Sequence, residues 1–329
     1  MVIMGRRTHP ALLTPTPTGS GGRPCPSNTY EGTCARGAGG HMNFKDAEDL
    51  VDQLERRAGY LAGTGLAAAA FLACRGNRPL LLEGAPGVGK TAFAGAMATV
   101  LGRPLERVQC YPGLDASQVL YDWNFSAQML ALRAAGEGDH TDRLPELWDD
   151  KYLVARPILR ALRGEPAVLL IDEIDRAEED FEALLLQVLD KFEITIPELG
   201  TIRADVAPFV ILTSNRTREP HDAVKRRCFY HWIDHPEPEL EARILRCHVD
   251  GLPPDLATAV SEAMAELRRL ELVKQPSLAE AIDYARAMHQ LGATAQTPKM
   301  VDAAISTLVK HHDDEEPVRR VLVGEQRSR

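Results

Sequence analysis

The sequence has no apolar run long enough to cross a bilayer, and its first residues contain no hydrophobic region of the signal-peptide type. A membrane-spanning helix needs roughly 20 mainly apolar residues, and a secretory leader needs an apolar core behind a basic start. We therefore expect a protein without a membrane span, located in the cytoplasm.

The chain also lacks an excess of basic residues. It carries 38 Lys and Arg against 47 Asp and Glu, which gives a formal net charge of -9 and a pI near 5.6. Binding along a phosphate backbone requires clustered positive charge. The composition therefore argues against a nucleic acid as the main partner.

No two of the six cysteines form a CxxC pair, and several lie within apolar segments. Disulfide frameworks and zinc sites both depend on characteristic cysteine spacings. The pattern predicts reduced, mostly buried thiols.

Residues 1–42 lack any periodic apolar face and are rich in Gly, Pro, Ser and Thr. Such a segment cannot bury enough apolar surface to offset the entropy lost on ordering. We predict a disordered N-terminal extension over residues 1–42. It is either a dispensable tail or precedes a true start at Met42.

The rest of the chain alternates short apolar runs with amphipathic segments. Continuous apolar runs that end in Gly or a polar residue predict strands buried on both faces. Strands that alternate with helices predict a parallel sheet covered on both faces. We therefore predict an α/β core over residues 43–236. Its predicted five-stranded parallel sheet is formed by residues 78–84, 105–111, 167–172, 209–215 and 228–234.

Two other patterns complete the predicted architecture. Residues 192–205 alternate apolar and polar side chains around a Pro-Glu-Leu-Gly turn, which predicts a β-hairpin. After the core, helical periodicity predicts a small all-α lid over residues 237–315, with its last helices at 278–290 and 298–311. We expect the charged residues 316–329 to form a flexible tail.

The stretch GAPGVGKT satisfies the pattern GxxxxGK[ST] and lies between a predicted strand and a predicted helix, as that motif requires. Its glycines allow backbone N–H groups to converge on phosphate oxygens, and the helix N-terminus adds partial positive charge. Lys90 is expected to reach the β- and γ-phosphates, and the Thr91 hydroxyl to ligate Mg²⁺. The predicted ATP-binding residues are Gly84, Ala85, Pro86, Gly87, Val88, Gly89, Lys90 and Thr91.

The stretch VLLIDEID places acidic residues at the end of a buried strand. Burial of a carboxylate is unfavourable unless a cation or hydrogen bonds compensate it, so Asp172 is predicted to serve Mg²⁺. Glu173 follows directly and is predicted to accept a proton from the attacking water. The alternative is that both acids only cap the following helix.

The next buried strand ends in Asn215, whose amide can orient a water molecule beside a γ-phosphate. Arg226 and Arg227 follow in the stretch DAVKRRC. An arginine supplied by a neighbouring subunit stabilises the charge of phosphoryl transfer. The alternative is that this pair is only a solvated surface.

Taken in order, GAPGVGKT, LLIDEID, LTSN and HDAVKRRCFYHW resemble the AAA+ ATPases, and more closely the MoxR family, over about residues 43–310. The resemblance implies a P-loop AAA+ core followed by a helical lid. It places Lys90 and Thr91 in Walker A, Asp172 and Glu173 in Walker B, Asn215 at sensor 1, and Arg227 rather than Arg226 at the arginine finger.

The stretches VQCYPGLDASQVLYDWNF and KRRCFYHWIDHP look most like the branch that contains the carbon-monoxide-dehydrogenase accessory ATPase, the CoxD-like branch. That resemblance implies a hexameric, chaperone-like ring that uses ATP and Mg²⁺ and matures a client metalloenzyme, such as a molybdenum hydroxylase of the CO dehydrogenase type. It also implies a partner with a von Willebrand A domain. The alternatives are a nucleotide switch with little hydrolysis and a nucleic-acid-linked AAA+ motor.

The sequence departs from the family in the lid and in one insertion. Where the family often has a sensor 2 arginine, this chain has QPSLAEAIDYARA, so we expect either a weaker coupling of the lid to the γ-phosphate or a substitution by Arg286. Residues 119–165 are long for the family, and their aromatic residues are expected to pack or to contact a protein. His231 and His235 lie about 13 Å apart on an extended strand, too far to share a metal ion.

Overall fold

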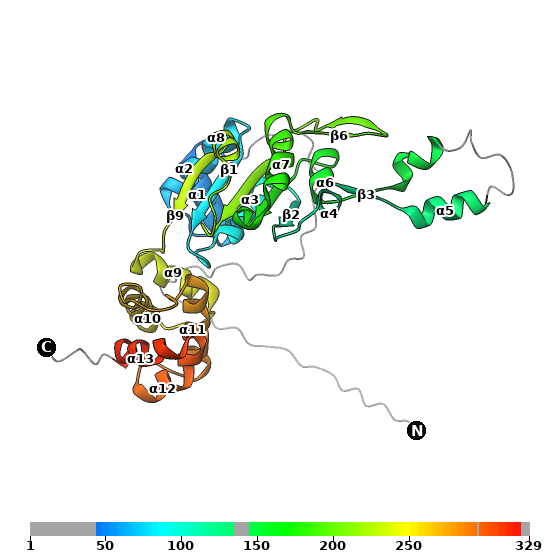
Figure 1. The fold of residues 1–329 in the computed structure, drawn as a ribbon. Coiled ribbons are helices and arrows are strands. Elements are labelled where there is room, and N and C mark those ends of the chain that lie inside the picture. The colour runs from blue at the N-terminus through cyan, green and yellow to red at the C-terminus, as the bar shows by residue number, and fades with distance from the viewer. Residues whose placement is uncertain (1–43, 135–144, 295, 324–329) are drawn as a thin grey trace, which may run out of the picture.

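The computed structural model describes residues 44–134, 145–294 and 296–323. The predicted disordered extension over residues 1–42 therefore lies outside the described residues. In the described part, an α/β core that contains a five-stranded sheet is followed by a separate group of helices (Figure 1).

The central sheet has the strand order β2-β5-β8-β1-β9, and all of its strand pairs are parallel. Every residue of β1, β5 and β8 is buried, which explains why these strands are continuous apolar runs in the sequence. The strands are β1 (Leu80–Gly84), β2 (Leu105–Gln109), β5 (Val168–Asp172), β8 (Phe209–Ser214) and β9 (Phe229–Ile233). The prediction of an α/β fold with a five-stranded parallel sheet is confirmed.

Helices cover both faces of this sheet, and successive strand residues point to opposite faces. Leu80 and Leu82 pack with α1 (Ala47–Ala58), α2 (Thr64–Arg75) and α3 (Lys90–Leu101) in one apolar core. Leu81 belongs to the other core, which contains side chains of α4 (Ala116–Val119), α6 (Pro157–Arg163), α7 (Glu179–Lys191) and α8 (Asp222–Arg227).

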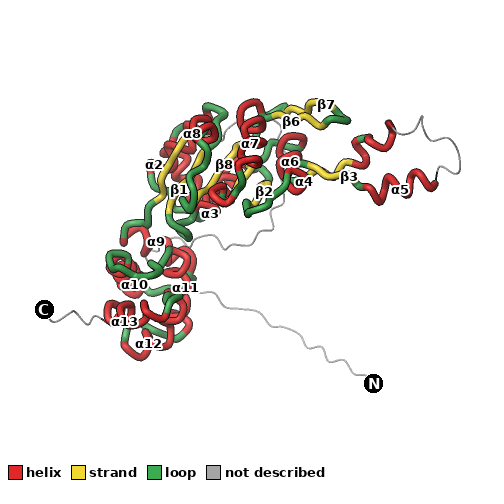
Figure 2. The backbone as a smooth tube through the Cα atoms, in the orientation of Figure 1, coloured by secondary structure: helices red, strands yellow, loops and turns green. Residues whose placement is uncertain are grey.

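Two antiparallel hairpins lie outside the central sheet (Figure 2). The predicted hairpin is present as β6 (Glu193–Ile196) and β7 (Gly200–Arg203), with Gly200 in the left-handed region at φ 81°. The second hairpin is the base of an arm that projects from the core (Figure 1). The arm comprises β3 (Tyr121–Trp123), α5 (Phe125–Ala134), η2 (Pro145–Trp148), η3 (Asp150–Tyr152) and β4 (Leu153–Ala155).

Some apolar side chains of the arm are packed, and others are exposed to solvent. Trp123 is buried and contacts Trp148 edge-on, with ring centroids 5.1 Å apart. Phe125, Met129 and Leu130 of α5 are exposed. The arm therefore has a packed base and an apolar outer surface.

The C-terminal group of helices has its own apolar core. It consists of α9 (Pro238–His248), α10 (Pro254–Leu267), α11 (Leu278–Gln290), α12 (Pro298–Ala304), η5 (Ile305–Thr307), η6 (His312–Asp314) and α13 (Glu315–Val323). We refer to this group as the lid.

The structure departs from the predicted end of the lid. The helix expected at residues 298–311 ends at Ala304 and continues as a 3-10 turn. The segment 316–323, expected as part of a flexible tail, is helical in α13 and buries Val318 and Leu322 in the lid core. These apolar residues share a helix face among charged neighbours, and their number is too small to dominate the sequence pattern.

Cys74, Cys110 and Cys228 are free thiols, and burial raises the pKa of each to about 12. Cys247 is disulfide-bonded, so the prediction of reduced thiols is wrong for this residue. Spacing could not reveal this bond, because pairing depends on which cysteines the fold brings together. Among the described residues, no helix has the length and apolar character needed to span a membrane.

Candidate nucleotide-binding and hydrolysis site

The turn GAPGVGKT connects β1 to α3 at the carboxyl end of the sheet. A Cβ atom on Gly84 would lie 2.3 Å from the Ile233 carbonyl oxygen, and one on Gly87 would lie 2.4 Å from the Ser277 hydroxyl oxygen. Gly87 also has a φ of 77°. Glycine is therefore required where the turn contacts the end of β9 on one side and the lid on the other.

Lys90 is the first residue of α3 and is buried. Its ammonium group donates to the carbonyl oxygens of Gly84 and Ala85, each at 2.7 Å. Burial lowers the pKa of Lys90, while nearby carboxylates led by Asp175 and Asp172 act in the opposite direction. The side chain is thus folded over the turn that is expected to bind phosphate.

Asp172 ends β5, and its side chain is only 4% exposed. One carboxylate oxygen accepts from the Thr213 hydroxyl at 2.5 Å and from the Thr91 hydroxyl at 3.0 Å. The other accepts from Arg107 Nη2 at 2.6 Å. The structure therefore brings Thr91 and Asp172 together, as the predicted Mg²⁺ site requires.

The donor set at this point fits Mg²⁺. Mg²⁺ prefers hard oxygen ligands and is usually held by a few protein groups together with substrate phosphates and water. A hydroxyl and a carboxylate oxygen, from Thr91 and Asp172, meet these requirements. The described residues contain no cluster of three or more His, Cys, Asp or Glu that could hold a metal without such a substrate.

Glu173 adopts a left-handed backbone conformation, with φ 57° and ψ 50°, immediately after the strand. Its backbone N–H donates to Thr213 Oγ1 at 2.9 Å, which fixes the turn. Its carboxylate lies 3.2 Å from Arg176 Nε and 3.5 Å from Asn215 Nδ2. The side chain makes no capping hydrogen bond to the following 3-10 helix, η4 (Ile174–Arg176), so the capping alternative has no support.

Asn215 is positioned by Asp175, a buried carboxylate that the sequence analysis did not select. Asp175 accepts from the backbone N–H of Asn215 at 3.2 Å and from the Thr217 hydroxyl at 2.6 Å. Although burial alone would raise it, hydrogen bonds from Thr217 and Asn215 lower the pKa of Asp175. Asp175 is the third acid of the stretch DEID, and this position is the sequence feature that could have identified it.

Thr213, Arg107 and Arg176 were also missed. Thr213 lies in the quoted stretch LTSN and is buried in β8. Nothing in the sequence distinguishes it from a threonine with only a structural role in a buried strand. Arg107 lies on a neighbouring strand, 65 positions before Asp172. Only the strand order brings that residue to the site.

Arg226 and Arg227 lie at the amino ends of the strands, whereas the phosphate-binding turn follows the carboxyl end of β1. They precede β9, whose first residue pairs with the first residue of β1, and their carbonyl oxygens accept from Arg78. The side chain of Arg226 is 82% exposed, whereas that of Arg227 is 36% exposed and has Nε 3.4 Å from Asp190 Oδ1. Neither arginine can therefore serve the nucleotide site of its own subunit.

The lid reaches the turn through Ser277, the N-cap of α11. Ser277 and Glu280 form a capping box, with the Ser277 N–H donating to Glu280 Oε2 at 2.8 Å. The predicted sensor 2 substitute, Arg286, lies about 12 Å further along the helix, where it pairs with Asp283 at 2.8 Å. The structure therefore does not bring Arg286 to the phosphate-binding turn.

A buried ion pair stabilises the segment that carries Ser277. Arg268 donates to both carboxylate oxygens of Glu241, at 2.7 and 2.8 Å, and to the Pro276 carbonyl oxygen at 2.9 Å. The side chains of Arg268 and Glu241 are 9% and 0% exposed. This pair links α9, the end of α10 and the start of α11.

The connection from β9 to the lid contains His235. Its Nδ1 is buried and has no hydrogen-bond partner among the described residues. Burial, followed by the charges of Arg268 and Lys90, lowers the pKa of His235 to about 4. This side chain is therefore neutral at physiological pH, and the charges of the lid residue Arg268 and of Lys90 both act on it.

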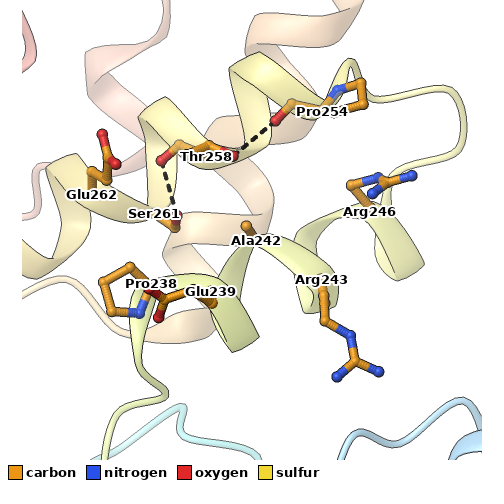
Figure 3. Close-up of a pocket in the computed structure, with 9 residues that line it drawn as sticks. All are labelled: Pro238, Glu239, Ala242, Arg243, Arg246, Pro254, Thr258, Ser261 and Glu262. Carbon is orange, nitrogen blue, oxygen red and sulfur yellow. Dashed lines mark hydrogen bonds between the residues drawn. The ribbon is translucent and has the colours of Figure 1, made fainter.

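A separate groove lies between α9 and α10 and has a cavity volume of about 280 Å³ (Figure 3). Its hydroxyl groups are used inside α10, because Thr258 donates to Pro254 and Ser261 donates to Thr258. Arg243 on its rim pairs with Glu55 of α1 at 2.9 Å. The groove therefore contributes no residue to the nucleotide site.

The sequence of this chain is similar to a known protein family and to several known proteins. Residues 79–228 match the AAA domain of the dynein-related subfamily. The protein NorQ of Paracoccus denitrificans is 26% identical over 259 residues, which cover 76% of this chain and 86% of NorQ. The gas vesicle ATPase GvpN of Haloferax mediterranei is 28% identical over 262 residues, which cover 72% of this chain and 70% of GvpN.

Proposed function

We propose that this chain, whose residues 79–228 match the AAA domain of the dynein-related subfamily, is an AAA ATPase that works as a ring-forming remodeller of a client protein. One observation carries the assignment of its catalytic site. Side chains from α3, the ends of β5 and β8, and the phosphate-binding turn converge within hydrogen-bonding distance of one another. Convergence at the carboxyl ends of parallel strands is typical of nucleotide sites in α/β proteins.

The proposed roles follow from the positions of the side chains. Residues 84–91 bind the phosphates through backbone N–H groups and Lys90. Thr91 and Asp172 hold Mg²⁺, which neutralises the charge that develops on the phosphate oxygens. Glu173 takes the proton from the attacking water, and Asn215, 3.5 Å from Glu173, orients that water.

Hydrolysis in this proposal requires a neighbouring subunit. Arg226 and Arg227 lie at the amino ends of the strands, and the nucleotide turn lies at their carboxyl ends. In this proposal they can therefore reach a nucleotide site only on another copy of the chain. The family resemblance favours Arg227 as the arginine finger. The exposure of the side chains favours Arg226, which is the more exposed of the two. We propose Arg227 as the finger in a hexameric ring and treat Arg226 as the alternative.

Trans complementation tests this arrangement. Lys90→Ala subunits cannot bind phosphate productively but retain the finger, while Arg227→Ala subunits retain the nucleotide site. We expect each variant alone to be inactive and a mixture of the two to recover part of the wild-type ATPase rate. If Arg227→Ala alone is active, whereas Arg226→Ala is inactive alone and recovers when mixed with Lys90→Ala, the finger is Arg226. If neither mixture recovers, the ring proposal is wrong.

The proposed client rests on similarity. The stretches quoted above support membership of the MoxR family and its CoxD-like branch, and the similarity to the gas vesicle ATPase GvpN supports ATP hydrolysis. We propose a metalloenzyme client, such as a molybdenum hydroxylase of the CO dehydrogenase type, and a von Willebrand A-domain partner. The apolar outer surface of the arm, with Phe125, Met129 and Leu130, is the proposed contact with these proteins.

Co-purification tests the client proposal. The full chain, expressed with the candidate hydroxylase and the A-domain protein, is expected to retain both in the presence of a non-hydrolysable ATP analogue. Phe125→Ser combined with Leu130→Ser should release them without changing ATP hydrolysis, because these side chains are exposed. Retention that is unchanged by these substitutions would exclude the arm as the contact surface.

The nucleotide-switch alternative keeps one observation in its favour. Two of the three acidic residues of the site lie beside an arginine, with Arg107 at 2.6 Å from Asp172 and Arg176 at 3.2 Å from Glu173. A site held in this state would bind nucleotide but hydrolyse it slowly. Single-turnover hydrolysis with and without partner proteins distinguishes the two, since a switch would show no acceleration by a partner.

A further inference from the structure

Arg107 reaches the nucleotide site from a strand that carries none of the expected site residues. In the register between β2 and β5, Gln109 lies opposite Asp172. Arg107 is two residues earlier on the same face of β2. Its Nη2 donates to Asp172 Oδ2 at 2.6 Å and to Gln109 Oε1 at 2.7 Å.

We propose that Arg107 acts as a gate for Mg²⁺. Its guanidinium neutralises Asp172 when no metal is bound and moves away when Mg²⁺ enters with the nucleotide. Arg107 would then set the Mg²⁺ concentration at which the site fills. The inference rests on the proposed assignment of Asp172 to Mg²⁺.

The exposure of the two partners supports an exchangeable contact. The side chain of Arg107 is 51% exposed, whereas that of Asp172 is 4% exposed. A buried carboxylate needs a compensating cation or hydrogen bonds, but a half-exposed guanidinium can regain water when it leaves. Gln109 at the protein surface offers it a second acceptor.

The hydrogen bonds of Asp172 explain why Arg107 and Mg²⁺ compete. Thr213 and Thr91 already donate to this carboxylate, and Arg107 takes the oxygen that Thr213 does not use. A second cation that approaches the same carboxylate meets the guanidinium charge in a poorly solvated place, where like charges repel strongly. A fixed, supporting role for Arg107 predicts the opposite, because its loss would then weaken metal binding.

The test measures metal affinity and does not depend on hydrolysis. A fluorescent non-hydrolysable ATP analogue is titrated with Mg²⁺ on the wild-type chain and on Arg107→Gln, and free Mn²⁺ is followed by electron paramagnetic resonance in a parallel titration. We expect the Mg²⁺ concentration at half-saturation to fall about fivefold or more in Arg107→Gln. Arg107→Lys keeps the positive charge on a shorter side chain, so its Mg²⁺ concentration at half-saturation should lie between those of the wild-type chain and Arg107→Gln. If Arg107→Gln folds poorly, the comparison of Arg107→Lys with the wild-type chain still tests the proposal.

The matched control is Arg160→Gln. Arg160 pairs with Glu106, the residue before Arg107 on β2, and makes no contact with Asp172. Its loss should leave the half-saturation unchanged. An unchanged or higher half-saturation in the Arg107 variants would overturn the gate. If the wild-type chain itself shows no Mg²⁺-dependent binding of the analogue, the metal assignment fails, and the gate fails with it.

Discussion

Two arginine–carboxylate pairs flank the phosphate-binding turn, and they differ in a way that separates an exchangeable contact from a fixed one. In the core, the half-exposed Arg107 touches Asp172 with one nitrogen atom. In the lid, Arg268 is only 9% exposed and forms two bonds to Glu241 and a further one to Pro276. The carboxylate is buried in both pairs.

The two carboxylates also differ in the other hydrogen-bond donors that contact them. Asp172 also accepts from Thr91 and Thr213, so the loss of Arg107 leaves it partly satisfied. Within the described part of the chain, the Glu241 carboxylate accepts its hydrogen bonds from Arg268, and burial raises its pKa while Arg268 opposes that rise. In our proposal the core pair is therefore the one that is exchanged for a metal, whereas the lid pair remains in place beside the contact between Ser277 and the turn.

The largest effect on stability is expected at the lid pair. Arg268→Ala leaves a buried carboxylate without its partner, which should lower the free energy of unfolding by about 3–5 kcal/mol. Urea denaturation measures this. Replacing both partners, with Glu241→Leu and Arg268→Met together, should restore most of the stability. A loss below about 1 kcal/mol in Arg268→Ala would show that the lid pair is as dispensable as an exposed pair.

A smaller loss is expected at Asp175, which positions Asn215. Asp175→Asn weakens the charge-assisted hydrogen bonds from Thr217 and Asn215, so the free energy of unfolding should fall by about 1.5–3 kcal/mol. Because Asn215 then loses its support, the hydrolysis rate should fall more than nucleotide affinity. The exposed Asp180→Asn is the control. Equal losses in rate and affinity would contradict a positioning role.

A pH-dependent effect is expected at His235, which lies in the connection from β9 to the lid. Its pKa in the folded chain is about 4, below its ordinary value of 6.5. Between these values the unfolded chain binds a proton that the folded chain does not, so stability falls as the pH falls from about 6.5 to 4. His235→Gln should flatten this decline in urea denaturation across that range, while the exposed His312→Gln should not. An unchanged slope in His235→Gln would remove this residue from the account.

The smallest effect is expected at the exposed end of the core. Arg226→Ala breaks only a pair between exposed side chains, so the free energy of unfolding should change by no more than about 0.5 kcal/mol. Thermal unfolding checks this. A larger loss would mean that exposure does not distinguish exchangeable from fixed pairs in this chain.

Much of the fold could be predicted from the sequence because buried parallel strands are continuous apolar runs. Residues 80–84 and 167–172 are examples, and the hairpin at 192–205 was predicted from its alternation and turn. The helix α13 was missed because Val318 and Leu322 are too few apolar residues to reveal a helix face. Its burial depends on the lid that surrounds it.

The site could be predicted where its residues are close in sequence or follow a strand. Lys90, Thr91 and Asp172 lie in short motifs, and the structure brings them together. Arg107 could not be selected, because its contact with Asp172 depends on the order and register of β2 and β5. Arg268 could not be selected either, since its partner is 27 positions away on another lid helix.

The central claim, that Glu173 activates water for ATP hydrolysis at this site, is tested most directly by single-turnover phosphate release from Glu173→Gln. Bound ATP is measured in the same sample. We predict that ATP binding is retained and that phosphate release slows by a factor on the order of 10² or more, while the exposed Glu179→Gln behaves like the wild-type chain. Phosphate release by Glu173→Gln at the wild-type rate would contradict the account.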